Sequence, residues 1–176
     1  MAYTIIDQLA GLLPIASTDA GFTAPGTSTA IASPPLSLGM IVKASDPTYG
    51  QGEFILLKGV ASTAVGSMVT WDGTTYQTTL SAVTANQGRP VAYAMAATTA
   101  ALWGWYQIGG TAVCAKSAVA IAPLVALGVN STGKVGNVAS GKQVLGARTA
   151  NAATVASATT TITVVMNRPH LQGRVS

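Results

Sequence analysis

The stretch Leu102-Trp-Gly-Trp-Tyr-Gln-Ile-Gly-Gly-Thr-Ala-Val-Cys-Ala115 decides how the rest of the chain is interpreted. Its residues alternate between two sets, which are Trp103, Trp105 and Gln107 on one side and Gly104, Tyr106 and Ile108 on the other. A period of two, with aromatic and β-branched residues, predicts a β-strand rather than a helix. Neither set is wholly polar, so we expect this strand to be buried on both faces, in a core or at a subunit contact.

The composition limits the class of protein. A chain of 176 residues is one domain, or one domain with an arm. Only 8% of the residues are charged, against about 25% in an ordinary globular protein, while 49% are hydrophobic and 19 are glycine. The apolar content is mostly alanine and valine, which suits closely packed sheets and glycine-rich turns. Because few charges keep the surface soluble, we expect neighbours to cover much of it.

The charges are unevenly distributed along the chain. The part up to Asp72 contains five acidic and two basic residues, and the part after it contains seven basic residues and no acidic one. This pattern fits a basic surface for an acidic partner, or sparse charges at loop tips. The second interpretation is favoured, because the sequence contains no basic cluster. No aromatic residues interleave with the basic ones, so no nucleic-acid partner is expected.

Cysteine usage and hydropathy give further limits. The single cysteine, Cys114, cannot form an internal disulfide and is predicted to be a small buried hydrophobe. The first residues lack the basic region of a signal peptide, so we expect synthesis in the cytoplasm. Residues 90–115 carry no charge, but they contain a proline, a glutamine and a Gly-Gly pair, so no membrane span is expected.

Residues 1–38 are predicted to form an extended N-terminal arm. Its segment 15–38 is rich in Ala, Ser, Thr, Gly and Pro and lacks the apolar density to fold alone. Residues 5–13 carry an apolar patch that includes Ile5, Leu9 and Leu12. This patch either anchors the arm on another surface or caps the chain's own barrel, and the sequence leaves both alternatives open.

Residues 39–170 are predicted to form the β-rich core domain, followed by a short tail at 171–176. Gly, Pro and Asp-Gly turn signals separate short strands. One helical turn is predicted at 97–102, and the sheet is expected to end at 167–170. The predicted strands are 40–44, 53–60, 68–71, 75–79, 91–96, 103–115, 123–129, 134–138, 140–148 and 159–166.

The second part of this domain resembles the first. Each part contains a hairpin, a Gly-x-x-Val strand and a closing strand. The matching positions lie at one constant spacing, in which Gly88, Val91 and Ala94 fall on Gly141, Val144 and Ala147. This pattern predicts an all-β fold, a small β-barrel or sandwich with two pseudo-repeated halves. Coincidence in a chain biased toward Ala, Val and Gly is the alternative.

The inventory of reactive side chains argues against an enzyme. The sole histidine, His170, follows a proline near the end of the sequence, and most of the five acidic residues lie in the arm or in predicted loops. We therefore assign no catalytic, cofactor-binding or metal-binding residue. The aromatic residues suit packing or interface contacts better than sugar stacking. The interface candidates are Ile5, Leu9, Leu12, Trp103, Trp105 and Tyr106.

Three stretches carry a resemblance to a known family. They are residues 38–66, which include Asp46-Pro-Thr-Tyr-Gly and Gly52-Glu-Phe, residues 88–95 (Gly-Arg-Pro-Val-Ala-Tyr-Ala-Met) and residues 103–113 (Trp-Gly-Trp-Tyr-Gln-Ile-Gly-Gly-Thr-Ala-Val). The chain from residue 38 to 169 resembles the capsid cement, or decoration, proteins of tailed bacteriophages. Residues 1–37 resemble nothing in that family.

The resemblance implies a β-rich virion protein on the capsid surface. Such a protein binds the outside of an assembled head, commonly as a homotrimer, and clamps neighbouring major capsid protein subunits against the internal DNA pressure. No cofactor is implied. The alternative is a carbohydrate- or receptor-binding β module displayed on a virion. A shell-forming subunit is disfavoured by the short chain and the lack of a long helix.

Overall fold

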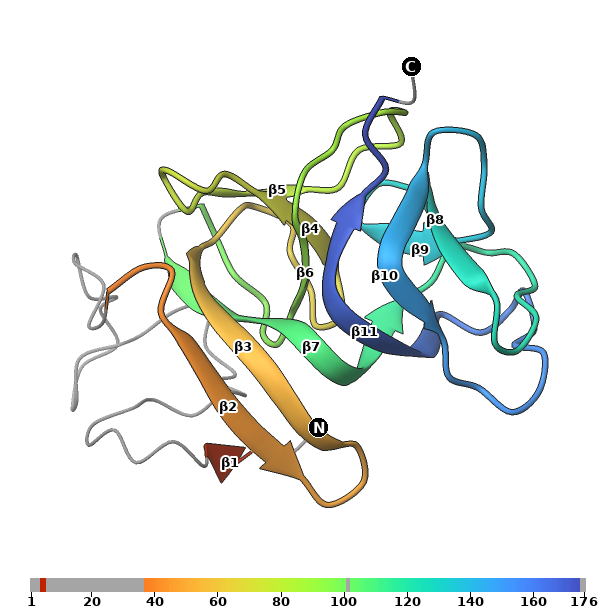
Figure 1. Ribbon diagram of the computed structural model, residues 1–176, viewed down its shortest axis with the longest axis horizontal. Coiled ribbons are helices and arrows are strands. Elements are labelled where there is room, and N and C mark those ends of the chain that lie inside the picture. Colours follow the sequence, from red (N-terminus) through yellow and green to blue (C-terminus); the bar gives the residue numbers. More distant parts are fainter. Residues whose placement is uncertain (1–3, 6–36, 101, 175–176) are drawn as a thin grey trace.

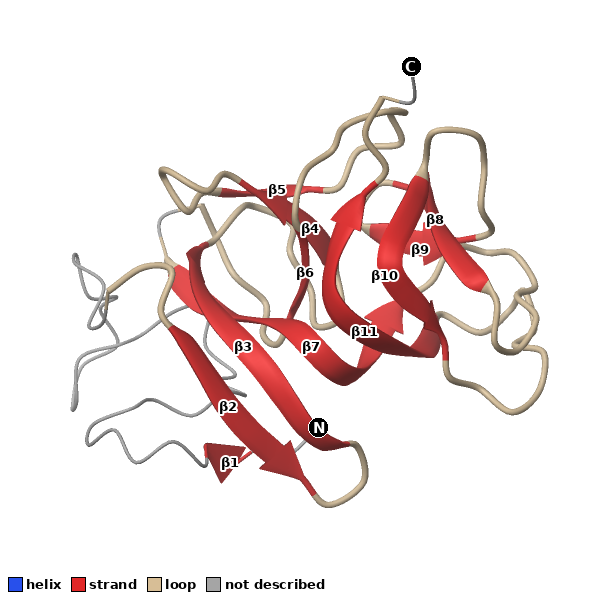
Figure 2. Ribbon diagram, in the orientation of Figure 1, coloured by secondary structure: helices blue, strands red, loops and turns tan. Residues whose placement is uncertain are grey.

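The structure, a computed structural model, describes residues 4–5, 37–100 and 102–174. These residues form eleven β-strands and no helix (Figures 1 and 2), which confirms the all-β prediction. The strands are β1 (Thr4–Ile5), β2 (Ile41–Asp46), β3 (Gly50–Lys58), β4 (Met68–Trp71), β5 (Thr78–Leu80), β6 (Val91–Ala94), β7 (Trp103–Ala115), β8 (Ala126–Ser131), β9 (Lys134–Gly136), β10 (Gln143–Thr149) and β11 (Thr161–Leu171).

The strands belong to one strongly curled antiparallel sheet. Its order is β1-β2-β3-β7-β11-β10-β8-β9, with β4, β5 and β6 branching from it beside β7. At 13 residues, β7 is the longest strand, and it pairs with β3, β6 and β11. The stretch predicted to be central is therefore the strand that joins the other parts of the sheet.

The sheet contains two closed units of five strands each that share β7 (Figure 1). The first runs β3-β7-β6-β4-β5 and is closed by a parallel bridge between Lys58 and Gln77. The second runs β7-β11-β10-β8-β9 and is closed by a parallel bridge between Lys116 and Val135. In each unit the first hairpin strand pairs with the Gly-x-x-Val strand, which in turn pairs with the closing strand.

Each unit has its own apolar interior. The interior of the first includes Leu57, Val69 and Tyr106, and that of the second includes Cys114 and Leu127. All four residues of β6 are buried, because one face of this strand lines the first interior and the other face packs on the second. A third cluster covers the outer face of β2, β3 and β7.

The predicted repeat is present in the topology, but the predicted match of Val91 to Val144 is wrong by one residue. Val91 faces away from the interior of its own unit and packs on the other unit, whereas Val144 lies in the interior of its own unit. The residue in the place of Val144 is Ala92, because Ala92 pairs with inward-facing Val69 as Val144 pairs with inward-facing Leu127. A shift of one residue moves a side chain to the opposite face of a strand.

Two local predictions are also wrong. Residues 97–100 and 102 form no helix; Leu102 N–H donates to Thr99 O in a single turn, and the Thr98 hydroxyl bonds the Tyr106 hydroxyl at 2.8 Å. The sheet does not end at residue 167, because β11 continues to Leu171 through a β-bulge opposite Gly146. Pro169 lies within this bulge, where the missing N–H leaves no ladder bond unmade.

Candidate functional site

The aromatic interface candidates lie in the core. Trp103 and Trp105 are 5% and 2% exposed and pack with Phe54 and Leu56, whereas Tyr106 is fully buried inside the first unit. The strand is therefore buried on both faces, as predicted. Because these side chains are covered within their own chain, their assignment to a subunit contact is corrected to core packing.

The candidates in the arm lie mostly outside the described residues. Leu9 and Leu12 are not described. Ile5 belongs to β1, whose backbone pairs with β2 of the same chain at Thr4–Ser45 and Ile5–Ala44. The described part of the arm thus extends the edge of the chain's own sheet.

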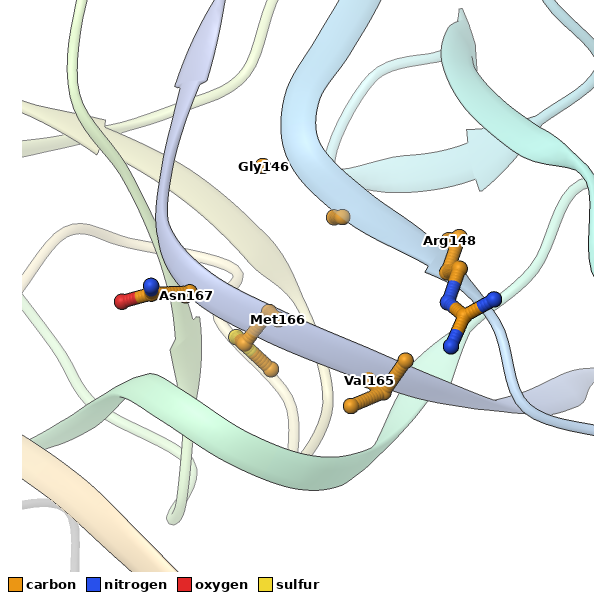
Figure 3. A pocket seen from close by; sticks show the side chains of 6 residues that line it. Gly146, Arg148, Val165, Met166 and Asn167 are labelled. Atoms are coloured by element: carbon orange, nitrogen blue, oxygen red, sulfur yellow. The ribbon is translucent and has the colours of Figure 1, made fainter.

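A cleft of about 380 Å³ lies at the β-bulge between β10 and β11 (Figure 3). Gly146 is required there, because it has a φ of 75° and a side chain would meet the carbonyl oxygen of Asn167 at 2.8 Å. Arg148 and Asn167 supply the polar side chains, and the rest of the lining is Gly146, Ala147, Val165 and Met166. This bulge cleft offers a guanidinium and an amide, but no carboxylate, thiol or imidazole.

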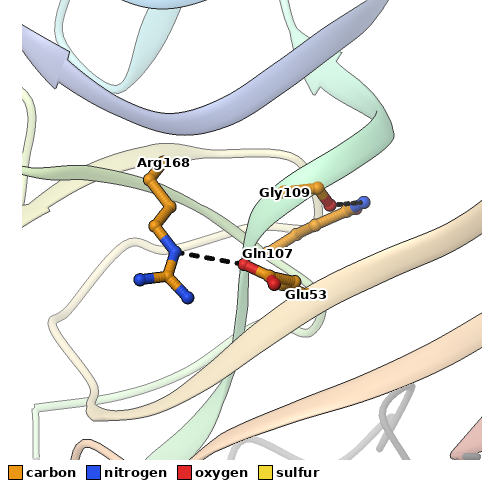
Figure 4. Close-up of polar contacts among 4 residues, drawn as sticks. All are labelled: Glu53, Gln107, Gly109 and Arg168. Carbon is orange, nitrogen blue, oxygen red and sulfur yellow. Dashed lines mark hydrogen bonds and ion pairs between the residues drawn. The ribbon is translucent and has the colours of Figure 1, made fainter.

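A second cleft, of about 280 Å³, shares Met166 and Asn167 with the bulge cleft and extends to Glu53. Beside it, the Arg168 guanidinium donates from Nε to Glu53 Oε2 at 3.2 Å (Figure 4). The two side chains are 63% and 29% exposed, so this ion pair contributes at most about 1 kcal/mol. It joins the β2–β3 hairpin to the closing strand of the second unit.

Gln107 supports the floor of this region. It is fully buried, and its side-chain amide donates to the carbonyls of Gly109 and Thr111 at 3.0 Å each (the first is drawn in Figure 4). These bonds brace the chain where Gly110 adopts a φ of 87°. A side chain at Gly110 would collide with the carbonyl oxygen of Gln51, so glycine is needed for the two strands to approach.

An apolar hollow of about 150 Å³ lies at the mouth of the first unit. Ile41, which is 43% exposed, lines it with Trp71 and Pro169, and Arg168 supplies a charge. The Trp71 ring stacks on Tyr76 with centroids 6.3 Å apart and an interplanar angle of 18°. Trp71 is the one tryptophan that is partly exposed.

Reactive groups are dispersed. Among the residues that the structure describes, no three His, Cys, Asp or Glu side chains lie together in a way that could hold a metal ion. His170 is exposed on β11, whereas Cys114 is buried, and burial raises the pKa of its thiol well above the usual value. The described residues form no helix, and so none that is long and apolar enough to cross a membrane.

The environment of Lys116 could not be predicted from the sequence. This lysine is 2% exposed, and its ammonium donates to the carbonyls of Ser117, Val119 and Ser157 at 2.9, 2.7 and 3.5 Å. The three carbonyls satisfy the three N–H groups of the buried ammonium. Lys116 is therefore a structural cation that ties two loops to the end of β7.

Comparison with known proteins does not extend this description. No family model, no curated protein and no solved structure matches the chain.

Proposed function

We propose that the chain is a non-enzymatic capsid cement protein of a tailed bacteriophage. The observation that carries the proposal is that the three stretches resembling that family are neighbours in space. Residues 38–66, 88–95 and 103–113 supply β2, β3, β6 and most of β7, and these strands pair with one another. The resemblance thus falls on one continuous structural unit rather than on scattered segments.

Properties of the described surface support this proposal. Most of the described aromatic side chains are buried, and no three His, Cys, Asp or Glu side chains come together among the residues that the structure describes. Several large apolar side chains are exposed instead, namely Ile41, Val65, Leu124 and Val138. Many shallow contacts of this kind, repeated around a shell, give an avidity that a single contact lacks.

The proposed partners are the major capsid protein and further copies of the chain in a homotrimer, on the outer surface of the virion. No nucleic-acid or membrane partner is included. The alternative, a carbohydrate-binding module, requires exposed aromatic rings for sugar stacking. Burial of Trp103 and Trp105 removes two of the three tryptophans from that role.

The test uses purified full-length chain and DNA-free heads of the phage that encodes it. We expect the chain to be trimeric by light scattering, to co-sediment with the heads and to raise their melting temperature. A monomer that leaves the heads unchanged would refute the proposal. Retention of that monomer on a glycan array would favour the carbohydrate-binding alternative.

A further inference from the structure

Three glycine–cation pairs meet at one end of the molecule. They are Gly88-Arg89, Gly141-Lys142 and Gly173-Arg174, which lie far apart in the sequence. Backbone hydrogen bonds join their segments: Asn86 N–H donates to Gly141 O at 2.8 Å, and Gly88 N–H donates to Gln172 O at 3.3 Å. In Figure 1 the loop before β6 lies beside the segment that follows β11.

The glycines make this convergence possible. Gly141 has a φ of 72°, and a side chain there would lie 2.7 Å from Asn86 Oδ1 and 2.8 Å from Ala85 Cβ. A Cβ added to Gly88 would be only 3.5 Å from the Cα of Gly173, so these two main chains are in direct contact. Gly141 packs on residues 85–86, which lie just before Gly88, so the cations that follow the three glycines lie on neighbouring segments. We call Arg89, Lys142 and Arg174 the basic end.

The cations of the basic end have no ion-pair partner among the described residues, and Arg89 has only a weak interaction with Asp72. Arg89 and Arg174 are exposed, Lys142 is partly exposed, and none of the three side chains forms an ion pair or hydrogen bond there. No Asp or Glu side chain follows Asp72 in the sequence. The pKa of Asp72 is lowered chiefly by the Thr75 and Thr74 backbone N–H groups and only last by Arg89.

A cleft of about 480 Å³ adjoins the basic end. Arg89 lines it together with Asn86, Gln87 and several threonine and alanine residues. The Gln87 side-chain amide donates to the carbonyls of Ala82 and Thr84 at 3.0 and 2.9 Å, which fixes one wall. Of the three cations, Arg89 lines this cleft, so the basic end borders a concave surface at Arg89.

We propose that the basic end docks onto an acidic protein surface, which the assembled capsid shell presents. The inference rests on the proposed function and specifies the chemistry of the contact. Arginine and lysine pair well with carboxylates, and complementary charge of this kind sets the orientation and rate of association. No aromatic side chain lines the cleft, so a surface for stacking nucleic-acid bases is absent from this part of the described chain.

The test compares two charge reversals of equal size. One variant is Arg89→Glu with Lys142→Glu, and the matched control is Lys58→Glu with Arg148→Glu, which lies away from the basic end. At low salt we expect the first variant to bind DNA-free heads roughly tenfold more weakly than the native chain, because two favourable pairs become repulsive. We expect the control to bind within about twofold of the native chain, since rim charges elsewhere contribute little.

A second probe separates this inference from the proposed function. Soluble poly-L-glutamate should bind the native chain and the control more tightly than the basic-end variant, whether or not heads are bound. Equal binding of poly-L-glutamate by all three proteins would overturn the inference. Duplex DNA that displaces the chain from heads more effectively than poly-L-glutamate would also overturn it, in favour of a nucleic-acid site.

Discussion

Lys58 and Lys116 close the two five-stranded units at equivalent steps. Lys58 is the last residue of β3, Lys116 directly follows β7, and each forms a parallel bridge, Lys58 to Gln77 and Lys116 to Val135. Their side chains differ, because Lys58 is partly exposed whereas the Lys116 ammonium is enclosed by three carbonyls. The same backbone arrangement therefore supports a surface cation in one unit and a structural cation in the other.

The first prediction concerns this pair of lysines. Lys116→Met should lower the free energy of unfolding by about 1–3 kcal/mol, because three buried carbonyls lose their donor. Lys58→Met is the control and should change it by no more than about 0.5 kcal/mol, as a surface substitution. Urea unfolding followed by fluorescence measures both. Equal effects would show that the carbonyl cage contributes nothing.

The second prediction contrasts two buried tyrosines. The Tyr93 hydroxyl is buried without a hydrogen-bond partner among the described residues, whereas the Tyr106 hydroxyl bonds Thr98 at 2.8 Å. Tyr93→Phe should raise the free energy of unfolding by about 1 kcal/mol, and Tyr106→Phe should lower it by about 1 kcal/mol. Thermal and urea unfolding of the two variants check the opposite signs. A loss of stability in Tyr93→Phe would mean that its hydroxyl is satisfied.

The third prediction is a loss of stability in alkaline solution. Burial raises the pKa of Cys114 well above 9.0 and that of Tyr93 well above 10.0, and it also raises the pKa of Tyr106. The unfolded chain therefore releases these protons at a lower pH than the folded chain. The free energy of unfolding should be constant up to about pH 8 and fall as the pH rises above about 9. Urea unfolding measured from pH 7 to 11 tests this prediction. The free energy of unfolding of Cys114→Ala should fall less steeply with pH than that of the native chain.

The fourth prediction uses two glycines in different surroundings. Gly141→Ala combines a positive φ with contacts below 3.0 Å and should cost about 1–3 kcal/mol. Gly73→Ala is the control, because no atom lies within 4 Å of its added Cβ, and it should change stability little. Differential scanning calorimetry compares the two. Similar melting temperatures would indicate that the contact between Asn86 and Gly141 adjusts to the added methyl group without loss of stability.

The sequence predicted the strands better than it predicted what covers them. Alternation identified β7 and its two apolar faces, but it could not show that the chain's own β2 and β3 cover Trp103 and Trp105. The two tryptophans were therefore predicted to lie at a subunit contact, although they lie in the core. Alternation describes the period of a strand, and the identity of the covering element depends on long-range pairing.

Other misses have similar causes. The constant spacing that matched Val91 to Val144 does not allow for the β-bulge opposite Gly146. This bulge changes the register along β10. The burial of Lys116 depends on closure of the second unit, which no local pattern records. The basic end was not predicted, because its three cations are separated by 53 and 32 residues in the sequence. Their segments are joined only by backbone contacts between loops.

The sharing of β7 has a consequence for cooperativity. Two units linked by a loop could melt one after the other, but here β7 supplies ladder bonds to both, and β6 fills both interiors. Unfolding of either unit would remove β6 and β7 from the packing of the other unit. The chain should therefore unfold in a single calorimetric transition. Under a pulling force, the two units should unfold together rather than one after the other.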